Sequence, residues 1–233
     1  VVDAATNSFS IAPDDEHVLA DVSSGDGKNF VKAVLGAELD EDGVPTSVSY
    51  VAEAKPASGT AWTSKVNSSQ NVCVSWVLNV KNGSEDTTQN MDVMISCATA
   101  NLFTKATGQT NDYAKYFRMA IYAEDDLAFL YLNETESKTY CVATDDTLNG
   151  SQTLSNYKKA GAMQKINSAA DASYTAEKGD GAGTQKLCTL AGQDDKDLTF
   201  VVWCEGTATP EAEVAANAVD LAFKLVGISA VNA

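Results

Sequence analysis

The feature that most constrains the fold of this chain is a two-residue alternation of apolar side chains. In VCVSWVLNV, one side of an extended strand would carry Val72, Val74, Trp76, Leu78 and Val80. The same alternation returns in MDVMISCA, YFRMAIYA and AVDLAFKLVGI. A period of two is typical of β-strands that turn one face to a core. The pattern therefore predicts a chain built mainly from β-strands.

Turn-forming residues separate the strand-like runs. The segments GDGKN, DEDGVP, KNGSED and TLNGSQ are rich in Gly, Asn and Asp, which favour turns. About nine or ten short strands at this spacing indicate a sandwich or a jelly roll. We therefore predict an all-β, jelly-roll-like antiparallel sandwich that forms a single domain over residues 13–233.

One region departs from the alternation. From about residue 147 to residue 196, the composition is dominated by Ser, Ala, Gly, Asp and Lys. The stretch SNYKKAGAMQKINSAADASY is compatible with one short helix. We predict a long, partly helical or irregular insertion between two sandwich strands, with a small separate subdomain as the alternative, because long structureless loops are uncommon in compact domains.

Charge excludes several classes of partner. The formal net charge is −16, with 32 acidic residues against 16 Lys and Arg, and Arg118 is the only arginine. Nucleic-acid binding needs a cationic surface, and anionic membranes attract basic segments. No apolar run approaches the roughly 20 residues of a membrane-spanning helix. We therefore expect neither nucleic-acid binding nor membrane insertion.

The sequence offers little for catalysis. His17 is the only histidine, which excludes HExxH and His-rich metal sites. No GxSxG elbow, P-loop or dinucleotide-binding fingerprint is present. Clusters of carboxylates occur at 14–16, 40–42, 124–126 and 194–197. We predict no enzyme, no catalytic residue and no cofactor, and calcium bound by these oxygen ligands stays the alternative.

The cysteines and the first residue bear on the compartment. The five cysteines form no CxxC pair, and four of them lie in apolar runs, which predicts small buried side chains; disulfides stay the alternative if the protein is exported. The five cysteines are Cys73, Cys97, Cys141, Cys188 and Cys204, and all except Cys188 lie in apolar runs. The sequence starts at Val rather than Met, so we expect that a signal peptide was cleaved and that the protein is extracellular or on the cell surface.

Two stretches carry a family resemblance. ATNSFSI resembles the start of mature TasA/camelysin-type proteins, which are exported biofilm-matrix fibre proteins, and FVVWCEGTATPEAEVAANAVDLAFKL resembles a signature near their C-terminal end. Ala12 stands where Gly is usual, and Ala208 replaces the expected Asp. The matching residues include Thr6, Asn7, Phe9, Ile11, Trp203, Glu205, Gly206 and Thr207.

The resemblance implies a jelly-roll subunit that polymerises head to tail with copies of itself. Its N-terminal strand, within residues 1–12, would complete the sheet of the next subunit, with Val2, Phe9 and Ile11 as apolar donor residues. Asn7, Trp203, Glu205 and Gly206 would be structural, and Trp203 is expected to be a packing aromatic. Pairing of residues 1–12 within their own sheet is the alternative for this strand.

For function, the expectation is a structural subunit of an extracellular filament, either a pilus or a matrix fibre. Two alternatives stay open. One is a monomeric surface module that binds a carbohydrate or a protein. The other is a viral or phage structural jelly roll.

Overall fold

The structure is a computed structural model, and it describes a defined part of the chain. The described residues are 5–11, 18–19, 22, 24, 27–33, 38, 48–53, 70–96, 102–108, 114, 117–131, 151–152, 185–204 and 219–229. Their regular structure consists of β-strands, and no α-helix occurs within these ranges. The predicted all-β antiparallel sandwich is confirmed, whereas a jelly-roll strand order is not.

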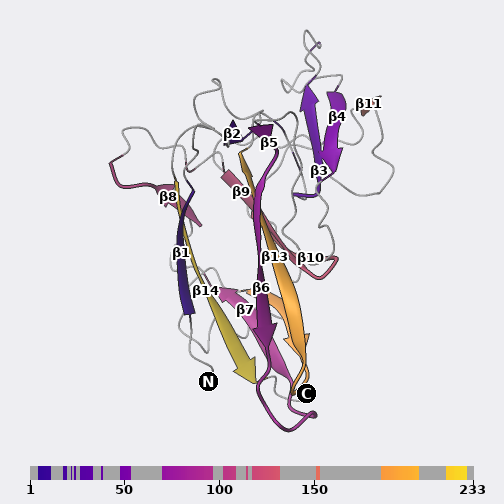
Figure 1. Cartoon of the computed structure of the whole chain (residues 1–233), viewed down its shortest axis with the longest axis vertical. Helices are drawn as coiled ribbons and strands as arrows, with labels where there is room; N and C mark the ends of the chain where they lie inside the picture. The colour runs from indigo at the N-terminus through magenta and orange to yellow at the C-terminus, as the bar shows by residue number, and fades with distance from the viewer. Residues whose placement is uncertain are drawn as a thin grey trace.

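The first main sheet has the strand order β1–β14–β7–β12, and all its pairs are antiparallel. These strands are β1 (Ala5–Ile11), β14 (Val219–Ser229), β7 (Met91–Ser96) and β12 (Gln185–Leu190). The short β8 (Phe103–Lys105) pairs with the beginning of β14. Figure 1 shows β1 and β14 side by side along one flank of the molecule.

The second main sheet has the order β10–β9–β13–β6 and is also antiparallel. Its strands are β10 (Asp126–Tyr131), β9 (Phe117–Ala123), β13 (Asp195–Cys204) and β6 (Val74–Lys81). The register between β13 and β6 is unbroken over the whole of β6. In the described part of the chain, β6 pairs with β13 only and is an edge strand.

Two smaller sheets complete the described structure. One joins β11 (Ser151–Gln152), β4 (Val48–Glu53) and β3 (Asn29–Ala33) in antiparallel order. The other is a short parallel pair of β2 (Val18–Leu19) and β5 (Gln70–Asn71).

The main core lies between the two large sheets. Alternate residues of β9, β13 and β14 point into it, as the period of two predicts. Aromatic rings connect the sheets: Phe200 of β13 stacks on Phe223 of β14 and on Trp76 of β6, each with ring centroids 5.2 Å apart. Offset stacking of this kind adds about 0.5–1.5 kcal/mol to the burial of each ring. The inward-facing residues include Phe117, Met119, Ile121, Leu198, Phe200, Val202, Val219, Leu221 and Phe223.

A second core covers the opposite face of the second sheet. Trp203 is fully buried there and meets Phe30 edge to face at 6.0 Å between centroids. Val201, Ala120 and Tyr122 line the same face. The second sheet is therefore buried on both faces around Trp203, which explains why its strands are apolar at positions that simple alternation assigns to solvent.

The expected single apolar face of residues 72–80 is partly wrong. Trp76, Leu78 and Val80 pack against the main core as predicted. Val72, however, packs in the second core, and Val74 keeps 38% of its surface exposed. The alternation fails here because β6 begins only at Val74, so Val72 precedes the strand and does not share its pleat.

The predicted insertion over about 147–196 extends into the main sheets. Gln185–Leu190 forms β12, and Asp195 begins β13. The last twelve residues of that range thus belong to the sandwich. At the other end, Ser151–Gln152 pairs with β4, and the expected short helix lies outside the described residues.

Candidate functional site

The predicted donor residues lie on an edge strand of the first sheet. The register pairs Asn7 with Phe223, Phe9 with Leu221 and Ile11 with Val219. In the described part of the chain, β1 has β14 of the same chain as its strand neighbour and nothing on its other side. Val2 lies outside the described residues.

The segment of β14 beneath β1 belongs to the main core. Val219 and Leu221 are fully buried, and Phe223 is 2% exposed. On its other side, β14 is already paired, with β8 over 219–221 and with β7 over 224–229. Without a strand in the β1 position, β14 would present unpaired backbone N–H and C=O groups beside the core, which is costly. The edge therefore needs a strand, whichever chain supplies it.

Among the described residues, the pairing between β1 and β14 covers only part of β14. The last register pair joins Ala5 to Leu225, while β14 continues to Ser229 along β7. Residues 226–229 thus have no partner on the β1 side among the described residues.

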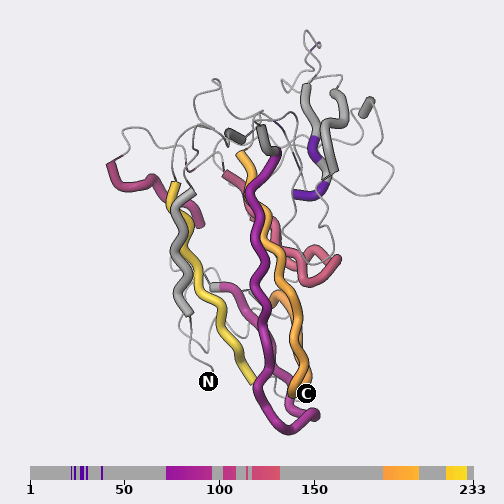
Figure 2. Tube along the Cα trace, viewed as in Figure 1, coloured from indigo at the N-terminus to yellow at the C-terminus, as the bar shows by residue number. Residues whose placement is uncertain are grey.

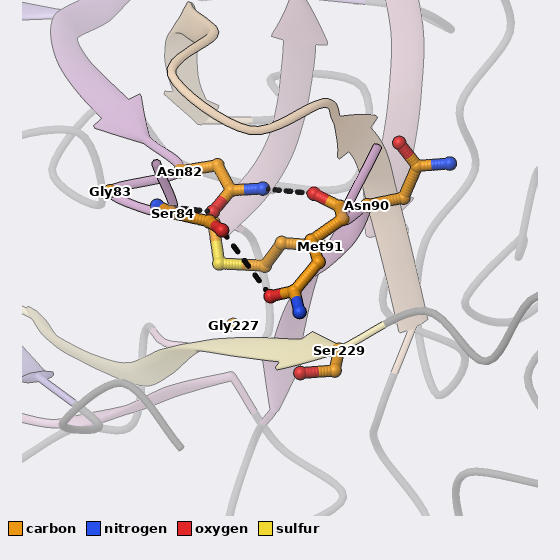
Figure 3. Close-up of a pocket in the computed structure, with 8 residues that line it drawn as sticks. Asn82, Gly83, Ser84, Asn90, Met91, Gly227 and Ser229 are labelled. Atoms are coloured by element: carbon orange, nitrogen blue, oxygen red, sulfur yellow. Dashed lines mark hydrogen bonds between the residues drawn. The ribbon is translucent and has the colours of Figure 1, made fainter. Parts of the chain in front are cut away.

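A hollow of about 370 Å³ lies beside Gly227 and Ser229 of β14. Figure 3 shows Asn82 and Ser84 on one side of Met91, with Ser229 of β14 on the other. Among the described residues that line the hollow, none comes from β1 and none is ionisable, in contrast to the net charge of −16 of the whole chain. They are Asn82, Gly83, Ser84, Gln89, Asn90, Met91, Gly227 and Ser229.

The loop that forms one wall of the hollow is residues 82–90. Asn82–Gly83 is a strong hairpin signal in sequence, but here it opens a crossover, because β6 and β7 belong to different sheets. The turn at 191–194 crosses between the same two sheets. Figure 2 shows the 82–90 loop at the lower end of the molecule, close to the end of β14.

Asn82 anchors this loop. Its Nδ2 donates to the carbonyl oxygens of Gln89 at 2.8 Å and Leu190 at 3.1 Å, and its Oδ1 accepts from the Ser84 N–H at 3.1 Å. The backbone N–H of Asn82 donates to Asp194, and the Gln193 N–H donates to Asn82, each at 2.9 Å. The loop and the turn therefore hold each other in one conformation, which fixes the shape of the hollow.

The described residues that line the hollow carry several hydrogen-bonding side chains. The Ser84 hydroxyl donates to Oε1 of Gln89 at 3.2 Å, and Asn90 and Ser229 add an amide and a hydroxyl. Neutral amides and hydroxyls both donate and accept, as the backbone of an extended peptide does. The sequence analysis missed this hollow, and its only signal there was the Asn82–Gly83 pair.

The signature residues are dispersed relative to this edge. Trp203 is buried in the second core, where it packs against Phe30, consistent with a packing aromatic. Gly27, with φ of 75°, approaches the Trp203 ring so closely that a Cβ would lie 2.8 Å from it. Glu205 and Gly206 lie outside the described residues. The structure therefore does not bring Trp203 together with the β1 edge.

The acidic clusters in the described ranges make local contacts. Asn79 donates to Asp195 and Asp197 at 2.8 and 2.9 Å, and the Lys196 ammonium lies 3.5 Å from Glu124. Among the residues that the structure describes, no group of three or more His, Cys, Asp and Glu side chains is placed to hold a metal ion.

Two of the cysteines whose burial is described fit the expectation of small buried side chains. Cys73 and Cys204 are buried, and Cys188 is half-buried on β12. Burial raises the pKa of the Cys73 thiol from 9.0 to about 12. Burial also raises the pKa of Cys188.

Comparisons with known proteins give no relative: no family model, no curated protein and no solved structure matches this chain. In the described ranges, no helix has the length and apolar character to cross a membrane.

Proposed function

We propose that this protein is a structural subunit of an extracellular filament, and that it polymerises by placing its first strand on β14 of a neighbouring subunit. The observation that supports this proposal is the position of β1. It is an edge strand of seven residues, joined to the sandwich through β14 alone in the described structure, and it covers the edge of a core strand.

The register between β1 and β14 can form within one chain or between two chains. If β1 leaves its own sheet, β14 needs a replacement, and β1 of a second copy offers the same side chains in the same order. Such a contact is head to tail and does not close, so it produces a filament. Pairing within one chain is then the closed form of the subunit, and pairing between chains is the assembled form.

Engineered disulfides distinguish these two forms. Ser8 and Ala222 are direct register partners, and Ala222 is exposed. Cα atoms of such antiparallel partners lie about 4.5–5.5 Å apart, within the range that a disulfide spans. We would prepare S8C and A222C as single variants, mix them under conditions that give filaments, and oxidise the mixture.

A disulfide between an S8C subunit and an A222C subunit supports the proposal, because each chain carries only half of the pair. A T104C variant mixed with S8C is the control, since Thr104 is exposed on β8, on the far side of β14. Wild-type protein oxidised in parallel accounts for its own cysteines. Absence of the S8C–A222C product in assembled material contradicts strand exchange.

A further inference from the structure

We propose that Asn82 is a latent deamidation site, which the folded 82–90 loop holds unreactive and which reacts once this loop opens. The reaction then makes the opening permanent, because its product no longer fits the closed loop. This inference stands independently of the proposed function.

The sequence at Asn82–Gly83 is chemically labile. In deamidation, the backbone nitrogen of the following residue loses its proton and attacks Cγ of the asparagine side chain. A new C–N bond forms, the bond from Cγ to Nδ2 breaks, and the amide nitrogen takes up a proton and leaves as ammonia. Water then opens the succinimide ring to aspartate or isoaspartate. Because Gly83 has no Cβ, its nitrogen can approach Cγ with little steric hindrance.

The structure places the two residues of this pair in different surroundings. Asn82 is 6% exposed, whereas Gly83 is exposed, and a Cβ on Gly83 would meet nothing within 4 Å. Water therefore reaches the backbone at Gly83. What holds the reaction back is the fixed position of the Asn82 side chain.

Three hydrogen bonds fix the Asn82 carboxamide (Figure 3). Nδ2, the leaving group, donates to the carbonyl oxygens of Gln89 and Leu190, and Oδ1 accepts from the Ser84 N–H. Cyclisation moves Cγ towards the Gly83 nitrogen and releases Nδ2, so it must break these bonds. Each bond shifts the opening equilibrium by about fivefold, so the three together slow deamidation by about a hundredfold relative to an open chain.

The product fits the closed loop less well than asparagine does. An aspartate side chain has no N–H to donate, and its carboxylate would face the carbonyl oxygens of Gln89 and Leu190. An isoaspartate also lengthens the main chain by one carbon, which displaces the backbone bonds between residue 82 and the 191–194 turn. Deamidation therefore prevents the 82–90 loop from closing again on that turn.

Peptide mass spectrometry of the full chain measures the loss of Asn82 in native buffer and in urea at one mildly alkaline pH. Asn149 is the internal standard in urea, because the same Gly–Ser sequence follows it. We expect the two asparagines to react at equal rates in urea, and Asn82 to react about a hundredfold more slowly in the native protein. A synthetic peptide of residues 78–88, measured in both buffers, corrects for the effect of urea on the reaction itself.

A variant that opens the loop without changing the Asn–Gly–Ser sequence tests the cause. G192A places a Cβ against the Asp86 carbonyl oxygen of the loop and should speed the loss of Asn82 in native buffer by about tenfold or more. N79A is the control, because the Asn79 side chain bonds to Asp195 and Asp197 on β13 and not to the loop, and it should keep the wild-type rate.

Q193A is the second variant, should G192A fail to fold. It removes the hydrogen bond from Gln193 Nε2 to the Glu85 carbonyl oxygen and should raise the rate by about two- to fivefold. A wild-type rate in folded G192A or Q193A, or a raised rate in N79A, overturns the inference. A native rate equal to that of the peptide overturns it as well, and so does an equally slow loss in urea.

Hydrogen exchange of the isolated deamidated protein tests whether the opening is permanent. The Gln193 N–H, which donates to the backbone carbonyl of residue 82 in the closed loop, should exchange about tenfold faster or more than in the wild type. Unchanged exchange at Gln193 overturns the one-way step.

Discussion

Replacing Asn82 by alanine removes the side-chain hydrogen bonds that hold the 82–90 loop together and join it to the end of β12. The Asn82 side chain is 6% exposed and takes part in three hydrogen bonds. Alanine leaves the carbonyl oxygens of Gln89 and Leu190 without the amide donor and the Ser84 N–H without its acceptor. The backbone bonds of residue 82 to the 191–194 turn do not depend on the side chain.

The size of the effect follows from those bonds. A net contribution of about 1 kcal/mol for each hydrogen bond gives a loss of about 3 kcal/mol in the free energy of unfolding. For a domain of 150–250 residues, each kcal/mol lowers the melting temperature by about 2–4 °C. N82A should therefore melt about 6–12 °C below the wild type. N82D should be at least as unstable, because a carboxylate would face two carbonyl oxygens.

Urea denaturation and thermal melting, followed by circular dichroism, measure both quantities. N79A is the matched control, because Asn79 lies on β6 three residues before Asn82 and donates two hydrogen bonds, but at an exposed position. We expect N79A to lose less than about 1 kcal/mol, as exposed polar contacts contribute little. An N82A protein within about 1 kcal/mol of the wild type would refute the assigned role of this side chain.

Three further predictions concern close packing and a buried thiol. G192A should lose about 1–3 kcal/mol in the free energy of unfolding, because its Cβ would clash with the Asp86 carbonyl oxygen. G83A is the control: its Cβ would meet nothing within 4 Å, so it should unfold like the wild type in the same urea titration. G27A should lose about 2 kcal/mol or more in that titration, since a positive φ disfavours a Cβ that would also press on Trp203. Burial raises the pKa of the Cys73 thiol from 9.0 to about 12, so the unfolded chain loses this proton first as pH rises. The free energy of unfolding should therefore fall as pH rises from about 9 towards 12. A C73A variant with the same decline contradicts this cause.

The alternation of apolar residues was sufficient to predict the main strands. Phe117, Met119 and Ile121 face the main core as their spacing indicates, and so do Val219, Leu221 and Phe223. A period of two specifies which residues share a face, and a buried face makes that register energetically strong. The class of fold was therefore accessible from sequence.

The strand order and β12 were not accessible in the same way. In QKLCTL, a register shift between Lys186 and Cys188 interrupts the alternation, and the flanking composition is that of a loop. Arg118 alternates with apolar residues as a solvent-facing residue would, yet it is fully buried and donates to the Phe117 carbonyl oxygen. Burial on both faces of a sheet depends on distant segments, such as that of Phe30, which local patterns do not encode.

The candidate site was partly predictable. The motif ATNSFSI marked Asn7, Phe9 and Ile11, and these residues lie on an edge strand over the core. Val2, the third predicted donor residue, lies outside the described residues. The hollow lies between a loop at 82–90 and the end of β14, segments far apart in the sequence, so no single segment reveals it.

Electron cryo-microscopy of the purified, assembled protein tests the central claim most directly. The account predicts regular filaments in which β1 of each subunit pairs with β14 of its neighbour, with Phe9 opposite Leu221 of the adjacent chain. Dispersed particles that keep β1 on their own β14 under all assembly conditions, or filaments whose subunits do so, would contradict it.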